Sequence, residues 1–381
     1  MIQQLKFNEF TLFKKGSFDF GSKLNILIGE NGSGKTHVLK FLYASLNLLS
    51  AYQKDGRLFA QITEQNDTEI FKSVFKVGQI ADLINLSFRN KNTKVVDMKE
   101  EPLTNGETAS VIHRDLTGVE SENTVVFQKN GEQYDYKVRL RYRDIIVSNL
   151  IMNSDREEVP VGLLPKPLFL PTHELLTIFP HYLALRKEYQ LPYDSTYDDT
   201  IGKLGLPYRN QDTEVFTDIV NQLEKAIGGK IFLKDEKFYF HPNFANENQA
   251  LDINMTAEGW RKLGMLLQLL KNGALRRGMV LLWDEPEANL NPRLICLIAL
   301  VLIQLSNLGI QVFLTTHSLF LLKELDMLTK EKDKFKPGEV RYFNFLKPGK
   351  VEQGNTPEDL NNILLLDESL AQSDRYFQME E

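Results

Sequence analysis

The sequence has few of the features that mark several large classes of protein. Cys296 is the only cysteine among 381 residues, which excludes an intramolecular disulfide framework and a zinc site built on several cysteines. The longest apolar run, Leu294–Ile303, is about half of what a membrane-spanning helix needs. The first residues, Met1–Phe7, lack the apolar segment of a signal peptide. These absences predict a soluble protein of the cytoplasm that does not contact a membrane.

An excess of positive charge is also missing. The chain has 45 basic and 51 acidic side chains and a formal net charge of −6, so it is not a nucleic-acid binder of strongly basic overall composition. Any contact with nucleic acid would need a local basic patch. Apolar residues make up 42% of the chain and charged residues 25%, which is the composition of a globular protein, and the length predicts two to three folding units.

Short apolar strands and amphipathic helices alternate near both ends of the chain. The N-terminal segment is expected to form a hairpin that turns near Lys14-Lys15-Gly16. Further strands are expected over 24–28, 124–127, 134–147, 168–170, 279–283 and 310–314, and helices over 37–49, 79–88, 258–272 and 292–306. A second hairpin is expected to join 231–233 to 238–240. Strands that alternate with helices at this spacing predict a parallel α/β sheet.

A glycine-rich loop joins the strand at 24–28 to the helix at 37–49. It reads Gly29-Glu-Asn-Gly-Ser-Gly-Lys-Thr36 and fits the pattern G-x-x-x-x-G-K-[ST] without exception. Backbone N–H groups at the start of the helix would bind the β-phosphate of ATP, and glycines avoid a Cβ that would block this approach. Lys35 would bridge the β- and γ-phosphates, and Thr36 would offer its hydroxyl to Mg²⁺. The predicted nucleotide-binding residues of this loop are Asn31, Gly32, Ser33, Gly34, Lys35 and Thr36.

Polar side chains follow two other apolar strands. Asp284 and Glu285 end the strand at 279–283, and His317 follows the strand at 310–314. Because ligands of open α/β sheets bind at the carboxyl ends of the strands, these groups can face the same nucleotide. Asp284 is suited to hold Mg²⁺ through water, Glu285 to polarise the attacking water, and His317 to donate a hydrogen bond to the γ-phosphate. We therefore predict Glu285, His317 and Lys35 as catalytic residues, and Thr36 and Asp284 as metal ligands.

These three elements, in this order, resemble the ABC-type ATPase head of SMC, RecF and OLD-family proteins. Residues 284–287 match its Walker B motif and catalytic glutamate, 288–292 its D-loop and 316–318 its H-loop. The resemblance implies an α/β P-loop head, with a mixed sheet, flanking helices and an antiparallel β subdomain.

The matching segments divide the chain. The head would comprise residues 1–49 and 246–381. Residues 50–245 would form a large α+β insertion, with β elements over 120–170 and a helical lid over 174–230. In this division the head is split, and its two parts meet in one sheet.

The resemblance also implies that two heads enclose ATP between them. ABC heads place a Ser-x-Gly signature before a helix, where it contacts the γ-phosphate bound to the opposite subunit. The best match sets Gly259 at the glycine and Ala257 at the serine, and Thr256 could supply the hydroxyl one residue early. The implied contacts to the nucleotide of the second subunit are Thr256, Ala257, Glu258 and Gly259, with Asn291 of the D-loop where many relatives have histidine or aspartate. A homodimer or higher oligomer follows from this arrangement.

The resemblance favours one biological role over others. No sustained apolar heptads run through 50–245, so a long-armed DNA clamp is not expected. No Asp-x-Asp cluster of a Toprim nuclease follows the head. The chain is similar to free-standing AAA-family ATPase subunits of bacterial anti-phage systems, in which the ATPase regulates a separate effector, often a nuclease or toxin.

The alternative is a RecF-like DNA-repair ATPase that acts directly on DNA. Its motivation is a basic strand in which the cations alternate with apolar residues and would lie on one face: Lys137, Arg139, Arg141 and Arg143. A solvated face of a sheet explains the same pattern. A second basic stretch, at 261–277, is expected to be helix-surface charge.

Overall fold

The fold is known from a computed structural model of the chain. It describes residues 1–54, 64–76, 94–102, 108–115, 120–129, 132–141, 145–152, 165–208, 214–246, 249–331, 335–347 and 349–380. Within these ranges, none of the helices has the combination of length and apolar character that crossing a membrane requires.

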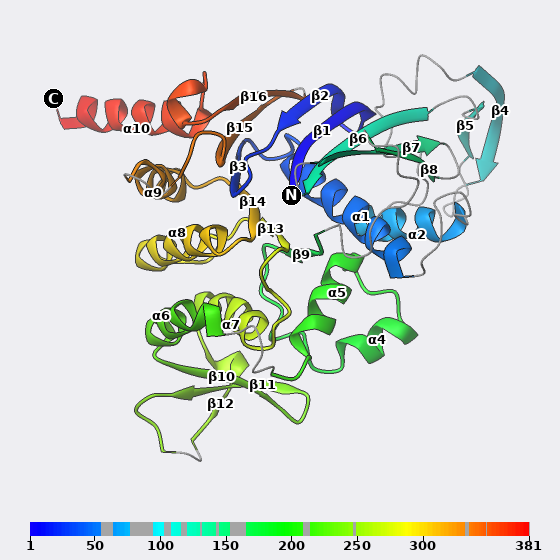
Figure 1. The fold of residues 1–381 in the computed structure, drawn as a ribbon. Coiled ribbons are helices and arrows are strands. Elements are labelled where there is room, and N and C mark those ends of the chain that lie inside the picture. Colours follow the sequence, from blue (N-terminus) through cyan, green and yellow to red (C-terminus); the bar gives the residue numbers. More distant parts are fainter. Residues whose placement is uncertain are drawn as a thin grey trace.

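A six-stranded mixed sheet lies at the centre of the molecule (Figure 1). In spatial order its strands are β16 (Lys350–Gly354), β15 (Val340–Leu346), β3 (Leu24–Gly29), β14 (Gln311–Thr316), β13 (Val280–Asp284) and β9 (Pro167–Leu170). All neighbours are parallel except β15 and β16. The glycine-rich loop therefore leaves the sheet at the same edge as the acidic end of β13.

Helices and a second sheet bury both faces of this sheet. Leu281 and Trp283 of β13 face a core formed with α7 (Glu258–Lys271), α8 (Pro292–Asn307) and α9 (Leu319–Lys330). Val280 and Leu282 face a second core, rich in phenylalanine, formed with α1 (Lys35–Lys54). Alternate residues of one strand enter different cores, which is why β13 reads as continuously apolar.

The second sheet is antiparallel and covers α1. Its strands, in spatial order, are β2 (Phe13–Asp19), β1 (Ile2–Phe10), β6 (Glu120–Lys129), β7 (Glu132–Arg141) and β8 (Ile145–Met152). A three-stranded sheet of β10 (Gly229–Lys234), β11 (Lys237–Pro242) and β12 (Leu251–Asp252) lies beside α6 (Thr217–Ile227) and α7. The remaining elements include α2 (Glu64–Phe75), β4 (Lys94–Pro102), β5 (Thr108–Asp115), α4 (Tyr182–Glu188), α5 (Ser195–Leu204) and α10 (Leu364–Glu380).

The predicted fold class is confirmed: the chain forms an α/β P-loop ATPase head with a mixed sheet, flanking helices and an antiparallel β part. Two local predictions are wrong. The N-terminal hairpin turns at Thr11-Leu12, so Lys14–Gly16 lie inside β2. The single strand expected over 134–147 is two antiparallel strands, β7 and β8. The helix expected over 79–88 lies outside the described residues.

Segments assigned to the insertion contribute to the head. β9 pairs in parallel with β13 at the edge of the central sheet, and β6 pairs with β1 in the antiparallel sheet. The hydroxyl of Thr200 in α5 donates to the carbonyl of Phe169 in β9 at 2.6 Å. The helical segment after residue 174 is thus packed against the head, and the division at residues 50 and 245 stays a prediction.

Candidate functional site

The glycine-rich loop joins β3 to α1 at the carboxyl edge of the central sheet. Gly29, Gly32 and Gly34 have φ of 140°, 72° and 98°, a region that residues with a Cβ rarely adopt. At Gly29 a Cβ would also come within 2.5 Å of the carbonyl oxygen of Phe345. The glycines of the motif are therefore required by the backbone of the loop itself.

Lys35 is folded back on this loop. Its Nζ donates to the carbonyl oxygens of Gly29 and Glu30, both at 2.8 Å, and the residue is only 5% exposed. Burial lowers the pKa of Lys35 to about 8, because a neutral amine is easier to desolvate than an ammonium. The Lys35 ammonium therefore binds two uncharged carbonyl oxygens of the loop. A phosphate bound to the loop would compete with these carbonyls for the ammonium.

This pKa predicts a pH-dependent affinity for ATP. In the free protein Lys35 loses its proton above about pH 8, whereas phosphate oxygens favour the ammonium, so binding above pH 8 takes up a proton. The dissociation constant for ATP should be roughly tenfold larger at pH 9 than at pH 7. Calorimetry at both pH values, in two buffers of different ionisation enthalpy, measures affinity and proton uptake together. An unchanged affinity with no proton uptake would show that Lys35 stays charged in the free protein.

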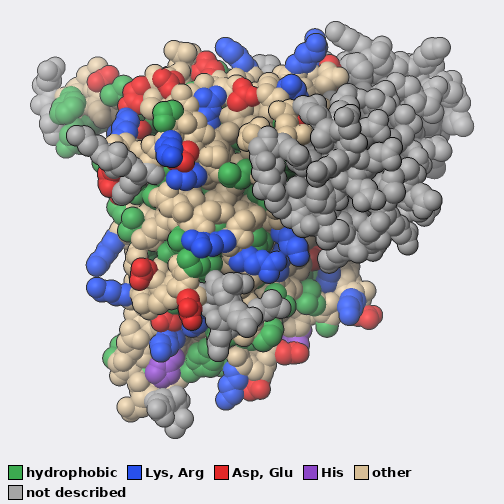
Figure 2. Space-filling model, viewed as in Figure 1, with side chains coloured by type: hydrophobic (Ala, Val, Ile, Leu, Met, Phe, Trp, Pro, Cys, Tyr) green, Lys and Arg blue, Asp and Glu red, His purple; other side chains and the backbone are tan. Residues whose placement is uncertain are grey.

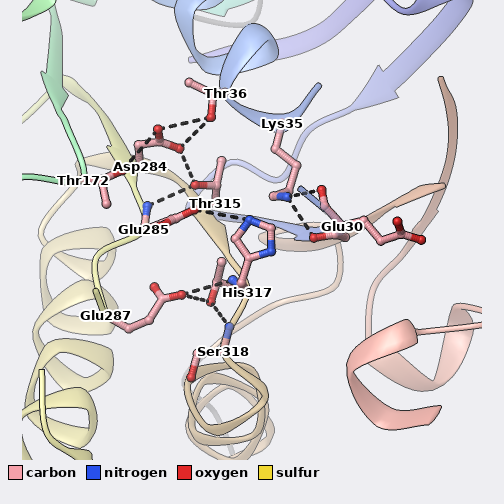
Figure 3. A network of polar contacts seen from close by, with 12 residues as sticks. Glu30, Lys35, Thr36, Thr172, Asp284, Glu285, Glu287, Thr315, His317 and Ser318 are labelled. Carbon is pink, nitrogen blue, oxygen red and sulfur yellow. Dashed lines mark hydrogen bonds and ion pairs between the residues drawn. The ribbon is translucent and has the colours of Figure 1, made fainter. Parts of the chain in front are cut away.

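Asp284 is the acceptor at the centre of the polar network (Figure 3). Its carboxylate accepts from the hydroxyls of Thr36 at 3.0 Å, Thr315 at 2.6 Å and Thr172 at 3.5 Å. These hydroxyls come from α1, β14 and the residues after β9. A carboxylate beside hydroxyl oxygens is the donor set that Mg²⁺ prefers, so Thr36 and Asp284 fit the metal predicted for them.

Glu285 and His317 lie together at the ends of β13 and β14. The Nε2 of His317 is 3.3 Å from Oε1 of Glu285, and this hydrogen bond lowers the pKa of Glu285 below its ordinary value. The backbone N–H of Glu285 donates to Thr315 Oγ1 at 3.0 Å. Glu285 has φ of 48°, a sparsely populated conformation for a residue with a side chain. The carboxylate is thus ionised and held beside the imidazole.

The predicted signature turn lies at the start of α7. The Thr256 hydroxyl donates to the carbonyl of Ile253 at 2.7 Å, and Ala257 is the N-cap but offers no side-chain acceptor to the helix. Glu258 accepts from Asn289 Nδ2 at 2.7 Å. A Cβ on Gly259 would lie 3.2 Å from the carbonyl oxygen of Asn289. This turn contacts the D-loop.

Asn291 has a structural role in the D-loop. Its side chain accepts from the backbone N–H of Leu294 at 3.1 Å and caps α8, as an asparagine at an N-cap does. Its oxygen caps the helix, and its amide N–H groups are the ones that can donate to a phosphate.

Several residues of this network were missed by the sequence patterns. Thr172 and Thr315 bind Asp284, while Glu287 accepts from the Thr316 hydroxyl at 2.6 Å and the His317 N–H at 3.1 Å (Figure 3). Lys262 donates to the carbonyls of Glu285 and Ala288. The doublet Thr315-Thr316 beside His317 was a visible signal, but a lysine in a helix gives none.

A family comparison covers more than half of the chain. The profile of the family described as "AAA domain, putative AbiEii toxin, Type IV TA system" matches residues 108–323. The chain belongs to this family. The match includes the signature turn, Asp284, Glu285 and His317, while the glycine-rich loop of this AAA-domain protein lies N-terminal to it. No curated protein that was compared matches the sequence.

Solved structures show the fold of this AAA-domain protein. An SMC head bound to the C-terminal winged-helix domain of ScpA is 14% identical, with a TM-score of 0.54 over 94% of this chain and 99% of that chain. A second similar structure is an Smc head domain with an extended coiled coil bound to the C-terminal domain of ScpA derived from Pyrococcus furiosus. It is 12% identical, with a TM-score of 0.50 over 99% of both chains. These similarities establish an SMC-type head fold.

Proposed function

We propose that this chain binds ATP with Mg²⁺ and hydrolyses it, as a switch whose heads dimerise around the nucleotide. The observation that supports this most is the convergence of three strand ends at one edge of the sheet. Thr36 after β3 lies 3.0 Å from Asp284 of β13, and Glu285 lies 3.3 Å from His317 after β14. These side chains are of the kinds that phosphoryl transfer to water uses.

The chemistry of each side chain assigns its role. Lys35 would exchange its two backbone carbonyls for the β- and γ-phosphates. Thr36 and Asp284 would hold the metal, which when bound neutralises charge on the phosphate oxygens. Glu285, ionised at neutral pH, would orient and deprotonate the attacking water. His317 would hold Glu285 through Nε2, and it can donate to the γ-phosphate at the same time only as an imidazolium, which carries an N–H on both ring nitrogens.

The signature turn supports a two-subunit site. The backbone N–H groups at the start of α7 have no side-chain cap from Ala257, and such a helix start binds anions. Hydrogen bonds link the turn of Thr256–Gly259 to the D-loop, and none of those found among the described residues reaches Lys35 or Thr36. We therefore propose that Thr256–Gly259, with the free amide nitrogen of Asn291, meet the nucleotide of a second copy.

A protein effector is the proposed partner. The description of the family names a toxin and a type IV toxin–antitoxin system, and the similar SMC heads are bound to domains of another protein, ScpA. The first supports a toxin–antitoxin setting and the second a head that binds another protein; that the head holds or releases a nuclease or toxin in anti-phage defence is our proposal. Co-purification with the product of a neighbouring reading frame, with and without ATP, tests this role. If no complex forms in either condition, the role is contradicted.

Phosphate release and molecular mass test the enzymatic part. The wild-type protein should release phosphate from ATP only with Mg²⁺, and mass photometry should show dimers with ATP and monomers without it. Hydrolysis at a rate per chain that does not depend on protein concentration, with no dimers, would contradict a two-subunit site.

A basic strand favours a second candidate, a DNA-repair ATPase. Positions 137, 139 and 141 alternate along β7 and share one face of the strand, while Arg143 lies outside the described residues. Lysine and arginine side chains also gather in the middle of the face shown in Figure 2. Duplex DNA should accelerate phosphate release by a repair ATPase, and the acceleration should fall with salt. We expect a change below twofold, because the net charge of −6 opposes DNA; salt-sensitive acceleration would favour the repair function.

A further inference from the structure

The turn that carries Glu285 has to be held in place by its surroundings. Glu285 has φ of 48° and Asn289, four residues later, has φ of 63°. Non-glycine residues in this region cost roughly 1 kcal/mol or more each. A turn with two such residues stays in one conformation only if neighbouring groups fix it. Among the residues that the structure describes, the carboxylate of Glu285 bonds only to His317.

Lys262 holds this turn from one side. It lies one helical turn into α7 and is 1% exposed. Its Nζ donates to the carbonyl oxygen of Glu285 at 2.6 Å and to that of Ala288 at 3.2 Å. A buried ammonium with neutral acceptors is costly, so these two bonds are strong constraints on the backbone they meet. The sequence-based assignment of Lys262 to helix-surface charge is therefore wrong.

Glu287 is part of the same turn and binds it to the end of β14. It is 9% exposed, and Oε1 accepts from the Thr316 hydroxyl and the His317 N–H at 2.6 and 3.1 Å. Its carboxylate thus fixes the backbone that carries His317. The electrostatic attraction between the charges of Lys262 and Glu287 acts across the turn. A buried lysine therefore binds the backbone of this turn, and a buried glutamate within the turn binds the residues at the end of β14.

We infer that Lys262 and Glu287 are positioning residues: they hold Glu285 and His317 in the orientation that hydrolysis requires. We also infer that Lys262 couples the position of Glu285 to the signature turn at the start of α7. The inference rests on the proposed function. The connection is a short one: Glu258 in the first turn of α7 bonds to Asn289 at 2.7 Å, and Lys262, four residues later on the same helix, bonds to Glu285. When the γ-phosphate of the ATP held by the second subunit binds at the start of α7, it would shift this helix. Because Lys262 of the helix is bonded to Glu285, the shift would reach the turn that carries Glu285.

A purely structural role is the alternative. Lys262 would then serve only to neutralise the buried Glu287, and removal of both charges would restore the protein, since replacement of a whole buried pair by neutral residues is often tolerated. Positioning makes a different prediction, because a methionine at position 262 has no N–H to donate to the Glu285 carbonyl. A variant that lacks both charges therefore distinguishes a structural role from a positioning role.

The single variant is Lys262→Met, with Lys271→Met as its matched control. Lys271 is in the same helix and its Nζ binds Glu224 at 3.1 Å, without contact to the turn. We expect Lys262→Met to bind ATP within threefold of wild type and to form ATP-dependent dimers, but to hydrolyse ATP at least tenfold more slowly. Lys271→Met should keep both properties within twofold. A Lys262→Met variant with a wild-type turnover number overturns the inference.

The double variant Lys262→Met/Glu287→Gln covers the case in which the single variant fails to fold. We expect its melting temperature to recover relative to Lys262→Met, while its turnover number stays at least tenfold below wild type with ATP affinity retained. Recovery of turnover together with stability shows a structural pair and overturns the inference. Absence of hydrolysis in wild type would instead contradict the proposed function, so the two failures are distinguishable.

Discussion

Replacement of Glu285 by Gln should lower the turnover number by at least about 100-fold and leave ATP affinity within a few-fold of wild type. The amide cannot take a proton from water, but it fills the same volume and can still bond to His317 Nε2, which is 3.3 Å from the carboxylate in the wild type. Dimers should accumulate because ATP holds the heads closed and is not consumed. Phosphate release under ATP saturation and mass photometry measure both effects.

Glu30→Gln is the matched control for this variant. Glu30 lies in the glycine-rich loop with its carboxylate exposed and bonded to Lys347 at 2.8 Å, so the same chemical change at the edge of the site should alter turnover less than twofold. If Glu285→Gln hydrolyses ATP at a wild-type rate, Glu285 is not the base. If hydrolysis stops but no dimers form with ATP, the site does not require a second head.

Replacement of Lys35 by Ala should weaken ATP binding by about 100-fold or more. A charge-assisted bond to phosphate in a buried site contributes several kcal/mol, and Lys35 is the cation whose ammonium already lies on the loop carbonyls of Gly29 and Glu30. Without it the β- and γ-phosphates would lose the one direct contact to a cationic side chain of the loop. Calorimetric titration with a non-hydrolysable ATP analogue measures the loss.

Lys347→Ala controls for the loss of positive charge near the loop. Lys347 interacts electrostatically with Lys35 and pairs with Glu30 at the surface, where solvent screens its charge. We expect its affinity for the analogue to change less than threefold. Equal losses in the two variants would mean that general electrostatics, rather than a direct bond from Lys35, governs binding.

The sequence predicts the centre of the site because the relevant signals are local. The glycine pattern before Lys35 specifies a backbone with positive φ, and an apolar strand that ends in Asp284 and Glu285 specifies a buried parallel strand whose polar end reaches the edge of the sheet. These signals predict which residues line the site, which strands and helix carry them, and that they lie at the same edge of the sheet. The roles assigned to these residues stay predictions.

Sequence patterns predict the boundaries of strands and domains less well than they predict the site. The strand at 167–170 is four residues long and follows a polar stretch, so nothing local distinguishes a head strand from part of an insertion. Its pairing with β13, more than one hundred residues later, shows that it belongs to the central sheet. Likewise Lys14–Gly16 resemble a turn, but the phenylalanines of β1 and β2 set the register and place them within a strand.

The near absence of cysteine and the lack of long apolar runs, together with the loop at 29–36 and the acidic strand end, were enough to determine an α/β nucleotide-binding head. Only the tertiary structure decided which charges lie inside it. Lys262 looks like any other lysine of an amphipathic helix, and Glu287 like any acid of a turn, yet both are buried and bonded to the backbone around Glu285 and His317. The physical reason is that the periodicity of a helix predicts only which of its faces is apolar. Whether a polar side chain can be buried depends on the carbonyl and N–H groups that other segments of the chain place beside it.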